Sequence, residues 1–366
     1  MMMRNITFAL LISLILVFSC KGKKEDSSNS TDTIKIGVVY PMSGDWAKYG
    51  EDARIAADIF LENLNKQKHK FNYEIIFEDN QGSPMRAHAA AQKLILLDKV
   101  DVIFSFLSRS SVPVSVLAEK NKVVGIFVVS DPSICDKNYG FCINIHPKDS
   151  AGKLHQTLLE KGAKKVSVIS VQTQGHLEMT RQFENIANDN NKINIIGKFV
   201  INPGEKDFRI TIPKMLRHNP DYIIVFMDNP EIDIFIKQLK EQNSSIPVTG
   251  IYLINKVEDK SLIEGLWSVE AQIDTEFHEQ YKSKTNLLSA NYGEYVYTML
   301  EVIVHAYENV GERNNEKVVE FIKGIKDLYT AQGPVSTSES NFISISPVLQ
   351  KIKNGQIIVI DESKSE

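Results

Sequence analysis

Catalytic and metal-binding motifs are missing from this 366-residue chain. The sequence contains no G-x-S-x-G elbow, no H-E-x-x-H pair, no phosphate-binding glycine loop and no G-x-G-x-x-G turn. These are the short signatures of several large enzyme classes. The eight histidines are scattered, and no two of them stand four residues apart as in a helical metal pair. We therefore expect neither an enzyme nor a protein that holds a metal or an organic cofactor.

Concentrated positive charge is also missing. The formal net charge is −4, and no cluster of lysine and arginine alternates with aromatic residues. This argues against a nucleic-acid partner. The apolar share of 43% and the charged share of 24% are those of a globular protein. The length is enough for two domains, each with a core of its own.

A long apolar run occurs only at the N-terminus. Residues 1–19 carry one charge, Arg4, and their apolar stretch is too short to span a bilayer comfortably, so they are predicted to be a signal peptide. The stretch ends at Ser19 and Cys20, which resembles the lipobox of bacterial lipoproteins and implies that Cys20 is acylated. Residues 20–32 are polar and are expected to form a flexible tether to the membrane surface. A plain signal peptide or a membrane anchor is the alternative.

Cysteine is scarce, which restricts its possible roles. If Cys20 is acylated, only Cys135 and Cys142 remain. Export places this pair in an oxidising compartment, where two cysteines so close in sequence are expected to form a disulfide. Closing so short a loop would stabilise the fold by roughly 2–3 kcal/mol. Asn138 and Gly140, between the two cysteines, suit a tight turn.

The body of the chain alternates between strand and helix patterns. The apolar run Ile34–Val39 ends at Pro41, and apolar residues then recur at helical spacing to Leu64. Two series of this kind predict an α/β fold with two doubly wound parallel-sheet domains. Near the C-terminus the pattern changes to short strands, and residues 348–360 predict a hairpin that turns at Asn354-Gly355. Further strands are predicted at 73–78, 100–106, 123–129, 165–171, 194–201, 221–226, 246–250 and 341–346.

Five segments, in this order and spacing, resemble the type I periplasmic solute-binding proteins of the leucine/isoleucine/valine-binding family, which serve ABC transporters. They are IKIGVVYPMSGDWAKYG at 34–50, SFLSRSSVPVS at 105–115, PKDSAG at 147–152, NPGEKDF at 202–208 and DYIIVFMDNPE at 221–231. The resemblance implies two lobes joined by three hinge crossings, with the ligand held between them. It places lobe 1 at 33–147 plus 275–335 and lobe 2 at 148–274 plus 336–361.

The predicted first-lobe part of the ligand site begins at Ser108. This serine stands between a strand end and a helix start, where hydroxyls and unpaired backbone N–H groups favour an anion. The resemblance assigns the ligand's carboxylate to Ser108, further polar contacts to Ser130 and Ser133, and an aromatic contact to Trp46 and Tyr49. Capping of the helix by the serines, and surface packing of the two aromatic residues, are the alternatives. The neighbouring Arg109 is expected to point outward.

The second lobe departs from the family pattern. The loop from Val171 to His176 keeps the family's glycine but lacks its aspartate and tyrosine, and Tyr252 stands where the family has a glutamate. Asp228 is therefore the candidate partner for a ligand ammonium, and Tyr252 a further contact. His176 is expected to be a solvent-facing residue at a helix start. An α-amino acid, an amide, a short peptide or another small polar metabolite remains possible as the ligand.

The resemblance implies a receptor on the extracytoplasmic side of the cell membrane. Anchored through Cys20, it would bind a small polar solute and deliver it to an ABC permease. A ligand sensor of the same fold, a surface lipoprotein that has lost its ligand, and an enzyme are the alternatives.

Overall fold

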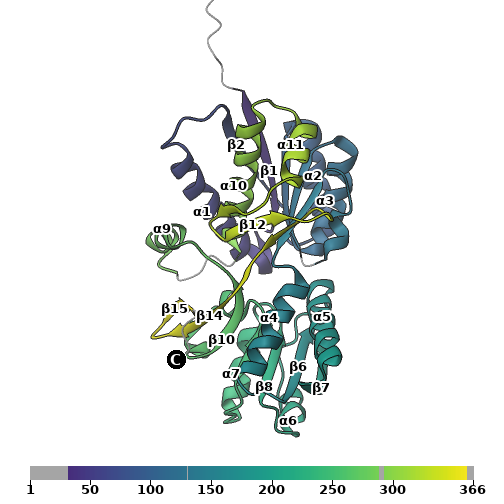
Figure 1. Cartoon of the computed structure of the whole chain (residues 1–366), viewed down its shortest axis with the longest axis vertical. Helices are drawn as coiled ribbons and strands as arrows, with labels where there is room; N and C mark the ends of the chain where they lie inside the picture. Colours follow the sequence, from purple (N-terminus) through teal and green to yellow (C-terminus); the bar gives the residue numbers. More distant parts are fainter. Residues whose placement is uncertain (1–31, 130, 288–291, 361–366) are drawn as a thin grey trace, which may run out of the picture. The chain divides into compact units, whose positions relative to one another are not determined.

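The structure is a computed structural model that describes residues 32–129, 131–287 and 292–360. The predicted signal peptide, Cys20, most of the tether and Ser130 lie outside the described residues. Within these ranges no helix is both long and apolar enough to cross a membrane. Figure 1 shows the arrangement of the helices and strands.

The first sheet contains eight strands among the described residues, including the first strand of the described chain. In spatial order they are β11 (Leu328–Thr330), β12 (Gly333–Thr337), β13 (Phe342–Ile345), β5 (Gly140–Asn144), β4 (Val124–Val128), β3 (Val102–Phe106), β1 (Thr33–Tyr40) and β2 (Asn72–Asp79). The strands from β13 to β2 pair in parallel, while β12 and β11 add to the edge in antiparallel. The strand order reverses at β1, which lies between β2 and β3, so a crevice opens beside the carboxyl end of this strand.

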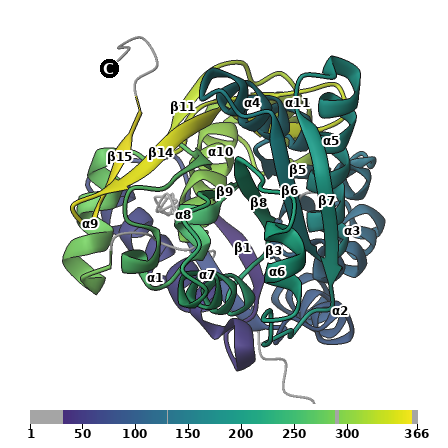
Figure 2. The same cartoon turned by 90° about the horizontal axis from the view of Figure 1, so that it is seen from below.

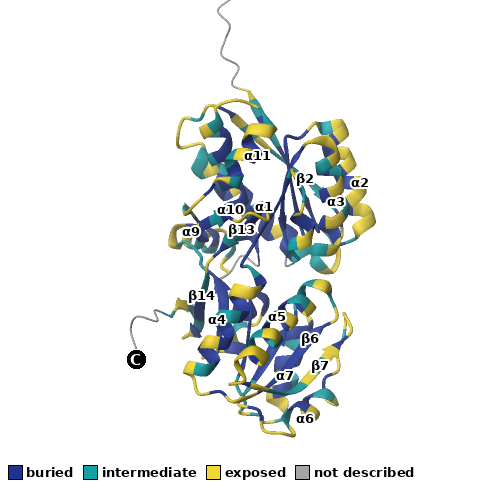
Figure 3. Ribbon diagram, turned by 45° about the vertical axis from the view of Figure 1, so that its right-hand side comes forward, coloured by how far each residue is buried: buried dark blue, intermediate teal, exposed yellow. Residues whose placement is uncertain are grey.

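Helices cover both faces of the first sheet, which explains why its central strands read as nearly continuous apolar runs. On β1, Ile36 and Val38 pack in one cluster with residues of α1 (Ala47–Leu64) and α10 (Gly293–Val310), whereas Val39 packs with those of α2 (Pro84–Gln92) and α3 (Ser108–Asn121) on the other face. Figure 3 shows the buried strands and the exposed outer turns of α2. The remaining helices of this lobe are η2 (Lys93–Asp98), η3 (Pro132–Cys135), α9 (Thr275–Thr285) and α11 (Asn315–Lys323), with η1 (Gly44–Trp46) before α1.

The second lobe contains a parallel sheet of four strands, in the order β7 (Asn194–Ile201), β6 (Lys165–Val171), β8 (Tyr222–Phe226) and β9 (Val248–Gly250). A sheet of three antiparallel strands, β10 (Trp267–Ala271), β14 (Pro347–Lys353) and β15 (Gln356–Val359), joins it through a bridge between Ile251 and Val269. Figure 2, seen from below, shows the labelled strands of this lobe side by side in the order β7, β6, β8, β9, β14 and β15. The helices here are α4 (Pro147–Glu160), α5 (Gln174–Asn190), α6 (Thr211–Leu216), α7 (Glu231–Glu241), α8 (Leu253–Lys256) and η4 (Lys260–Ile263). The order reverses again, at β6, so this lobe too has a crevice, between β6 and β8.

Within the described ranges the chain passes between the lobes three times: from β5 to α4, from β10 to α9, and from β13 to β14. The prediction that the last crossing lies at residue 336 is wrong. Residue 336 lies inside β12, and β13 continues the first sheet by pairing with β5. The crossing therefore falls at Ser346. A short strand's apolar pattern does not reveal which sheet it joins, because that depends on partners far away in the sequence.

Two local predictions are confirmed. Cys135, in η3, and Cys142, in β5, form a disulfide with their Cα atoms 5.5 Å apart. The strands β14 and β15 form the C-terminal hairpin, with Asn354 and Gly355 both in the left-handed region, at φ values of 53° and 69°. Asn-Gly is favoured in such a turn because both residues tolerate positive φ.

Candidate ligand-binding site

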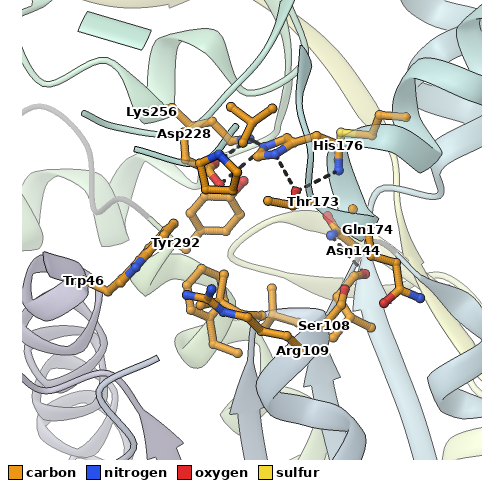
Figure 4. A pocket seen from close by; sticks show the side chains of 18 of the residues that line it. Trp46, Ser108, Arg109, Asn144, Thr173, Gln174, His176, Asp228, Lys256 and Tyr292 are labelled. Atoms are coloured by element: carbon orange, nitrogen blue, oxygen red, sulfur yellow. Dashed lines mark hydrogen bonds and ion pairs between the residues drawn. The ribbon is translucent and has the colours of Figure 1, made fainter. Parts of the chain in front are cut away.

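A cavity of about 300 Å³ lies at the carboxyl ends of strands from both lobes. Its first-lobe wall consists of Trp46, Phe106, Leu107, Ser108, Arg109, Val128, Val129, Asn144 and Tyr292. Its second-lobe wall consists of Val171, Gln172, Thr173, Gln174, Gly175, His176, Met179, Pro203, Asp228, Glu231 and Lys256. The loops after β1 and β3 and the loops after β6 and β8 all contribute, so the cavity joins the crevices of the two sheets. Figure 4 shows the labelled side chains around it.

The first-lobe wall presents the start of α3. Leu107 has a positive φ of 70°, and its carbonyl accepts the N–H groups of Ser110 and Ser111. The N–H groups of Ser108 and Arg109 come before the first bond of the helix and have no acceptor within it. The positive end of the helix dipole adds to them. Ser108 therefore lies, as predicted, where an anion is favoured, and it lines the cavity.

Arg109 brings a positive side chain to this end of the cavity. The residue is exposed, as expected, but it also lines the cavity. Its guanidinium carbon lies 5.7 Å from the centre of the Trp46 ring, a cation–π distance. The first loop thus supplies an aromatic face, and α3 supplies a cation that stacks on it.

A layer of packed aromatic rings supports this wall. The ring of Tyr292 lines the cavity and lies 5.3 Å from Phe106, 5.9 Å from Tyr49 and 5.6 Å from Tyr252 between ring centroids. Tyr49 and Tyr252 are buried behind Tyr292 and are not among the lining residues. Burial, with the negative charge of Asp228 nearby, raises the pKa of Tyr292 well above its usual value, so its hydroxyl stays neutral.

Tyr252 belongs to a hinge network instead of the cavity surface. Its hydroxyl donates to Oδ1 of Asn144 and lies 2.9 Å from the Tyr295 hydroxyl, which is itself 3.0 Å from the same oxygen. Asn144 ends β5, just before the first crossing, and its Nδ2 donates to the Val129 carbonyl over 3.1 Å. Asn144 therefore connects strand ends of the first lobe with α8 of the second.

The second-lobe wall contains a buried charge cluster made of Asp228, Lys256 and His176. Oδ1 of Asp228 lies 2.8 Å from Nζ of Lys256, and Oδ2 lies 3.3 Å from Nε2 of His176. The two side chains around the aspartate are almost fully enclosed, with exposed fractions of 3% for Lys256 and 7% for His176. Burial alone would favour the neutral acid, but the charges of Lys256 and His176 outweigh it and hold the pKa of Asp228 far below its usual value.

Backbone and side-chain contacts hold the members of this cluster in place. Thr173 caps α5, and its Oγ1 lies 2.8 Å from Nδ1 of His176. The carbonyl of Lys256 accepts a hydrogen bond from Nδ2 of Asn229 over 3.3 Å. The cavity's other acid, Glu231 at the start of α7, accepts the N–H of Gly204 over 2.6 Å. Both acids of this wall are therefore engaged by groups of the protein itself.

The predicted site residues separate into three groups. Trp46, Ser108 and Asp228 line the cavity. Tyr49 and Tyr252 lie behind its wall, and Ser133 is exposed in η3, where its N–H donates to Asp131. Ser130 is not described.

Several lining residues were not predicted, notably Lys256, Asn144 and Tyr292. The expectation that His176 faces solvent is wrong, since its imidazole is buried against Asp228. Lys256 lies four residues after Tyr252, the position already noted for its missing glutamate, so a search for replacement charges near that position would have found it.

Comparison with known proteins gives consistent matches over nearly the whole described chain. The family model of the periplasmic binding proteins matches residues 33–349. A leucine-, isoleucine-, valine-, threonine- and alanine-binding protein of Pseudomonas aeruginosa is 23% identical over 321 residues, covering 81% of this chain and 83% of the relative.

Two solved structures share the fold. A solute-binding protein of an ABC transporter from Rhodopseudomonas palustris, in complex with 3,4-dihydroxybenzoic acid, has a TM-score of 0.81 at 21% identity and covers 90% of this chain and 96% of its own. A branched-chain amino acid transporter substrate-binding protein of Streptococcus pneumoniae, in complex with isoleucine, has a TM-score of 0.78 at 18% identity and covers 90% and 100%. With its two α/β lobes and its cavity at both strand-order reversals, the chain therefore belongs to the type I periplasmic binding proteins of the leucine/isoleucine/valine-binding family, whose members bind solutes and are not enzymes.

Proposed function

We propose that this protein is the lipid-anchored receptor of an ABC transporter, which binds a small carboxylate-bearing solute between its lobes and delivers it to a permease. Family membership implies an extracytoplasmic location. The observation that carries the proposal is the position of the cavity between the lobes, with the start of α3 and Arg109 in its lining. Isoleucine and 3,4-dihydroxybenzoic acid, held by two proteins of the same fold, both contain a carboxylate.

Closure of the lobes on the ligand is part of this proposal. The three crossings between the lobes provide a hinge, and Asn144, just before the first crossing, accepts a hydrogen bond from Tyr252 of the second lobe. Nε2 of Gln174, from the second lobe, donates to Oδ2 of Asp131, from the first, near the cavity. A ligand that contacts both walls would stabilise this arrangement of the lobes.

A thermal-shift screen of amino acids, organic acids and related metabolites tests the binding function. A ligand that binds only the folded protein raises the melting temperature in a concentration-dependent way. We expect carboxylate-bearing compounds to do so, and calorimetry on the best of them to give a single site. A full screen without any stabilising compound would contradict the receptor function.

The membrane anchor is tested separately, because it depends on Cys20 alone. We expect Cys20→Ser to release the protein from membranes or to stall its processing, measured by detergent-phase partitioning. Cys135→Ser with Cys142→Ser is the control, since neither residue belongs to the lipobox-like segment. Unchanged partitioning of the Cys20 variant would contradict acylation at this residue.

A further inference from the structure

We propose that the ligand is a carboxylic acid without an amino group, because Lys256 already occupies the position at Asp228 that a ligand's ammonium would take. This inference rests on the proposed function and specifies the class of solute that the cavity binds. A leucine-type ligand needs an acceptor for its ammonium as well as donors for its carboxylate. The question is therefore whether the cavity has an acid available for a positive group.

Asp228 is already neutralised, since its oxygens contact Lys256 and His176. Oδ1 contacts Nζ of Lys256 at 2.8 Å and Oδ2 contacts Nε2 of His176 at 3.3 Å. An ammonium at this carboxylate would either share it with Lys256, a second cation, or displace Lys256. The lysine side chain is only 3% exposed and would then be left as a buried charge without its counter-ion. Such an exchange is unfavourable, because an isolated buried charge is poorly compensated by the protein.

The other acid of the lining, Glu231, is also engaged. It is buried, and its Oε1 accepts the backbone N–H of Gly204 over 2.6 Å. Among the described residues that line the cavity, Asp228 and Glu231 are the acids. A ligand ammonium would thus meet either Asp228, which Lys256 already neutralises, or Glu231, which is only 8% exposed and already accepts a backbone N–H.

The basic groups show the opposite balance. Lys256 is neutralised by Asp228, but no carboxylate among the described residues forms an ion pair with Arg109, whose guanidinium stacks on Trp46. The start of α3 adds backbone donors at Ser108. The cavity therefore has an unmatched positive end, which suits one carboxylate.

The rest of the lining defines the ligand's body. Phe106, Val128, Val171, Met179 and Tyr292 belong to the apolar part of the lining. The whole cavity has a volume of about 300 Å³, at the small end of ligand cavities. Such a volume fits a compact aliphatic or aromatic group. The ligand class is thus a small monocarboxylic acid with an apolar body and no amine.

Matched compound pairs test this inference on the purified wild-type protein. L-Leucine and 4-methylpentanoate share one carbon skeleton, as do L-phenylalanine and 3-phenylpropanoate, and the members of each pair differ by the amino group. We expect calorimetry to show the acid of at least one pair binding at least about tenfold more tightly than its amino acid, because Lys256 already neutralises Asp228 and repels a second cation there. Equal or tighter binding of the amino acids would overturn the inference and leave the receptor function intact.

A variant of Lys256 should reverse the preference. Lys256→Met keeps much of the side-chain volume and leaves Asp228 free to accept an ammonium, so we expect the amino acid of each pair to gain about tenfold in affinity. The double variant Lys256→Met with Asp228→Asn should lose that gain, since it removes the carboxylate that Lys256→Met frees. Lys122→Met, at an exposed lysine that pairs with Glu316, is the matched control and should leave both affinities unchanged. If Lys256→Met fails to fold, the wild-type pairs still decide the question.

The remaining outcomes separate the two proposals. Binding of another amine-free carboxylate from the full screen, with neither pair bound, supports the inference. The inference is overturned, while the receptor function stands, if an amine binds tightly or if every compound that binds lacks a carboxylate. Absence of binding by every compound overturns both.

Discussion

The two walls of the cavity carry opposite formal charges and use them differently. Among the described lining residues there are two acids, Asp228 and Glu231, and two strong bases, Arg109 and Lys256. In the second-lobe wall the lysine neutralises an acid of the same wall, at 2.8 Å. In the first-lobe wall Arg109 stacks on Trp46 and pairs with no described carboxylate. The sum of charges over both walls is zero. In the second-lobe wall, Lys256 neutralises Asp228 and a backbone N–H holds Glu231, whereas the cation of the first-lobe wall is left for a ligand.

The comparison teaches that a binding site is defined by which charged groups lack a partner, not by how many it contains. The two groups of a buried ion pair neutralise each other and serve only as part of the cavity wall. A cation without a partner beside helix N–H groups attracts an anion. It follows that substitutions in the second-lobe wall should act mainly on stability, and those in the first-lobe wall mainly on affinity. The predictions below test this division, from the largest expected effect to the smallest.

Lys256→Met should cause the largest loss of stability. It leaves Asp228, whose side chain is 18% exposed, with only His176 beside it. Removal of one partner from a buried pair costs about 3 kcal/mol in the free energy of unfolding. The pKa of Asp228 is lowered in the folded state, so the contribution of the pair is present above the unfolded value near 4 and is lost as the pH falls through the folded value. Urea unfolding at pH 7 and in acid measures this. Adding Asp228→Asn should recover part of the loss, and a full-size loss in the double variant would contradict the pairing.

Glu294→Gln should have the opposite effect, because Glu294 is a buried acid without a basic partner in the described structure. Its Oε1 accepts from Nδ2 of Asn255 over 3.3 Å. Burial, and the charges of Asp52 and Glu270, raise its pKa to about 7. Because the pKa of Glu294 is higher in the folded state, the neutral side chain contributes stability that is fully present below its unfolded pKa of about 4.5. This contribution is lost as the pH rises through about 7.

We therefore expect Glu294→Gln to stabilise the protein by about 2 kcal/mol at pH 8 and by little at pH 4.5. Thermal unfolding at both pH values measures the difference. Glu316→Gln, at an exposed ion pair with Lys122, is the control and should show no such gain at high pH. An equal effect of Glu294→Gln at both pH values would mean that the glutamate is ionised throughout.

Arg109→Met should weaken binding of a carboxylate ligand and leave the fold nearly unchanged. The guanidinium is exposed, so its contribution is partly screened by solvent, and a loss of about 1–2 kcal/mol in binding free energy is expected. Calorimetry with the best acid from the screen measures it. Arg209→Met, at an exposed arginine paired with Asp207, serves as the control. An unfolding free energy that falls as much as the affinity would contradict the proposed division between the walls.

Ser108→Ala should give the smallest effect. It removes one hydroxyl but keeps the N–H groups at the start of α3, so the expected loss is about 1 kcal/mol of binding free energy. The same calorimetric titration measures it. Ser133→Ala, at an exposed serine outside the lining, should change nothing. If Ser108→Ala leaves the affinity unchanged, the backbone N–H groups and Arg109 hold the carboxylate without this hydroxyl.

The sequence by itself determined the local features of this protein. The spacing of apolar residues predicted the strands and helices, the two series predicted two doubly wound lobes, and short-range chemistry predicted the Cys135–Cys142 disulfide and the turn at Asn354-Gly355. The loops after β1 and β3 were predicted to belong to the site because the end of an apolar run marks the end of a strand, and ligands bind at the carboxyl ends of such strands.

Only the tertiary structure decided how residues far apart in the chain pair with each other. It joined β13 to the first sheet, moved Tyr252 from the ligand to the hinge beside Asn144, and placed Lys256 and His176 around Asp228. His176 and Lys256 are separated by 80 residues, yet their side-chain nitrogens lie 3.2 Å apart. The periodicity of apolar residues predicts which side chains of a helix or strand face the interior. The charged group that such a side chain contacts there depends on the strand order and on how the two sheets approach each other. The partner of a buried acid is therefore a property of the fold.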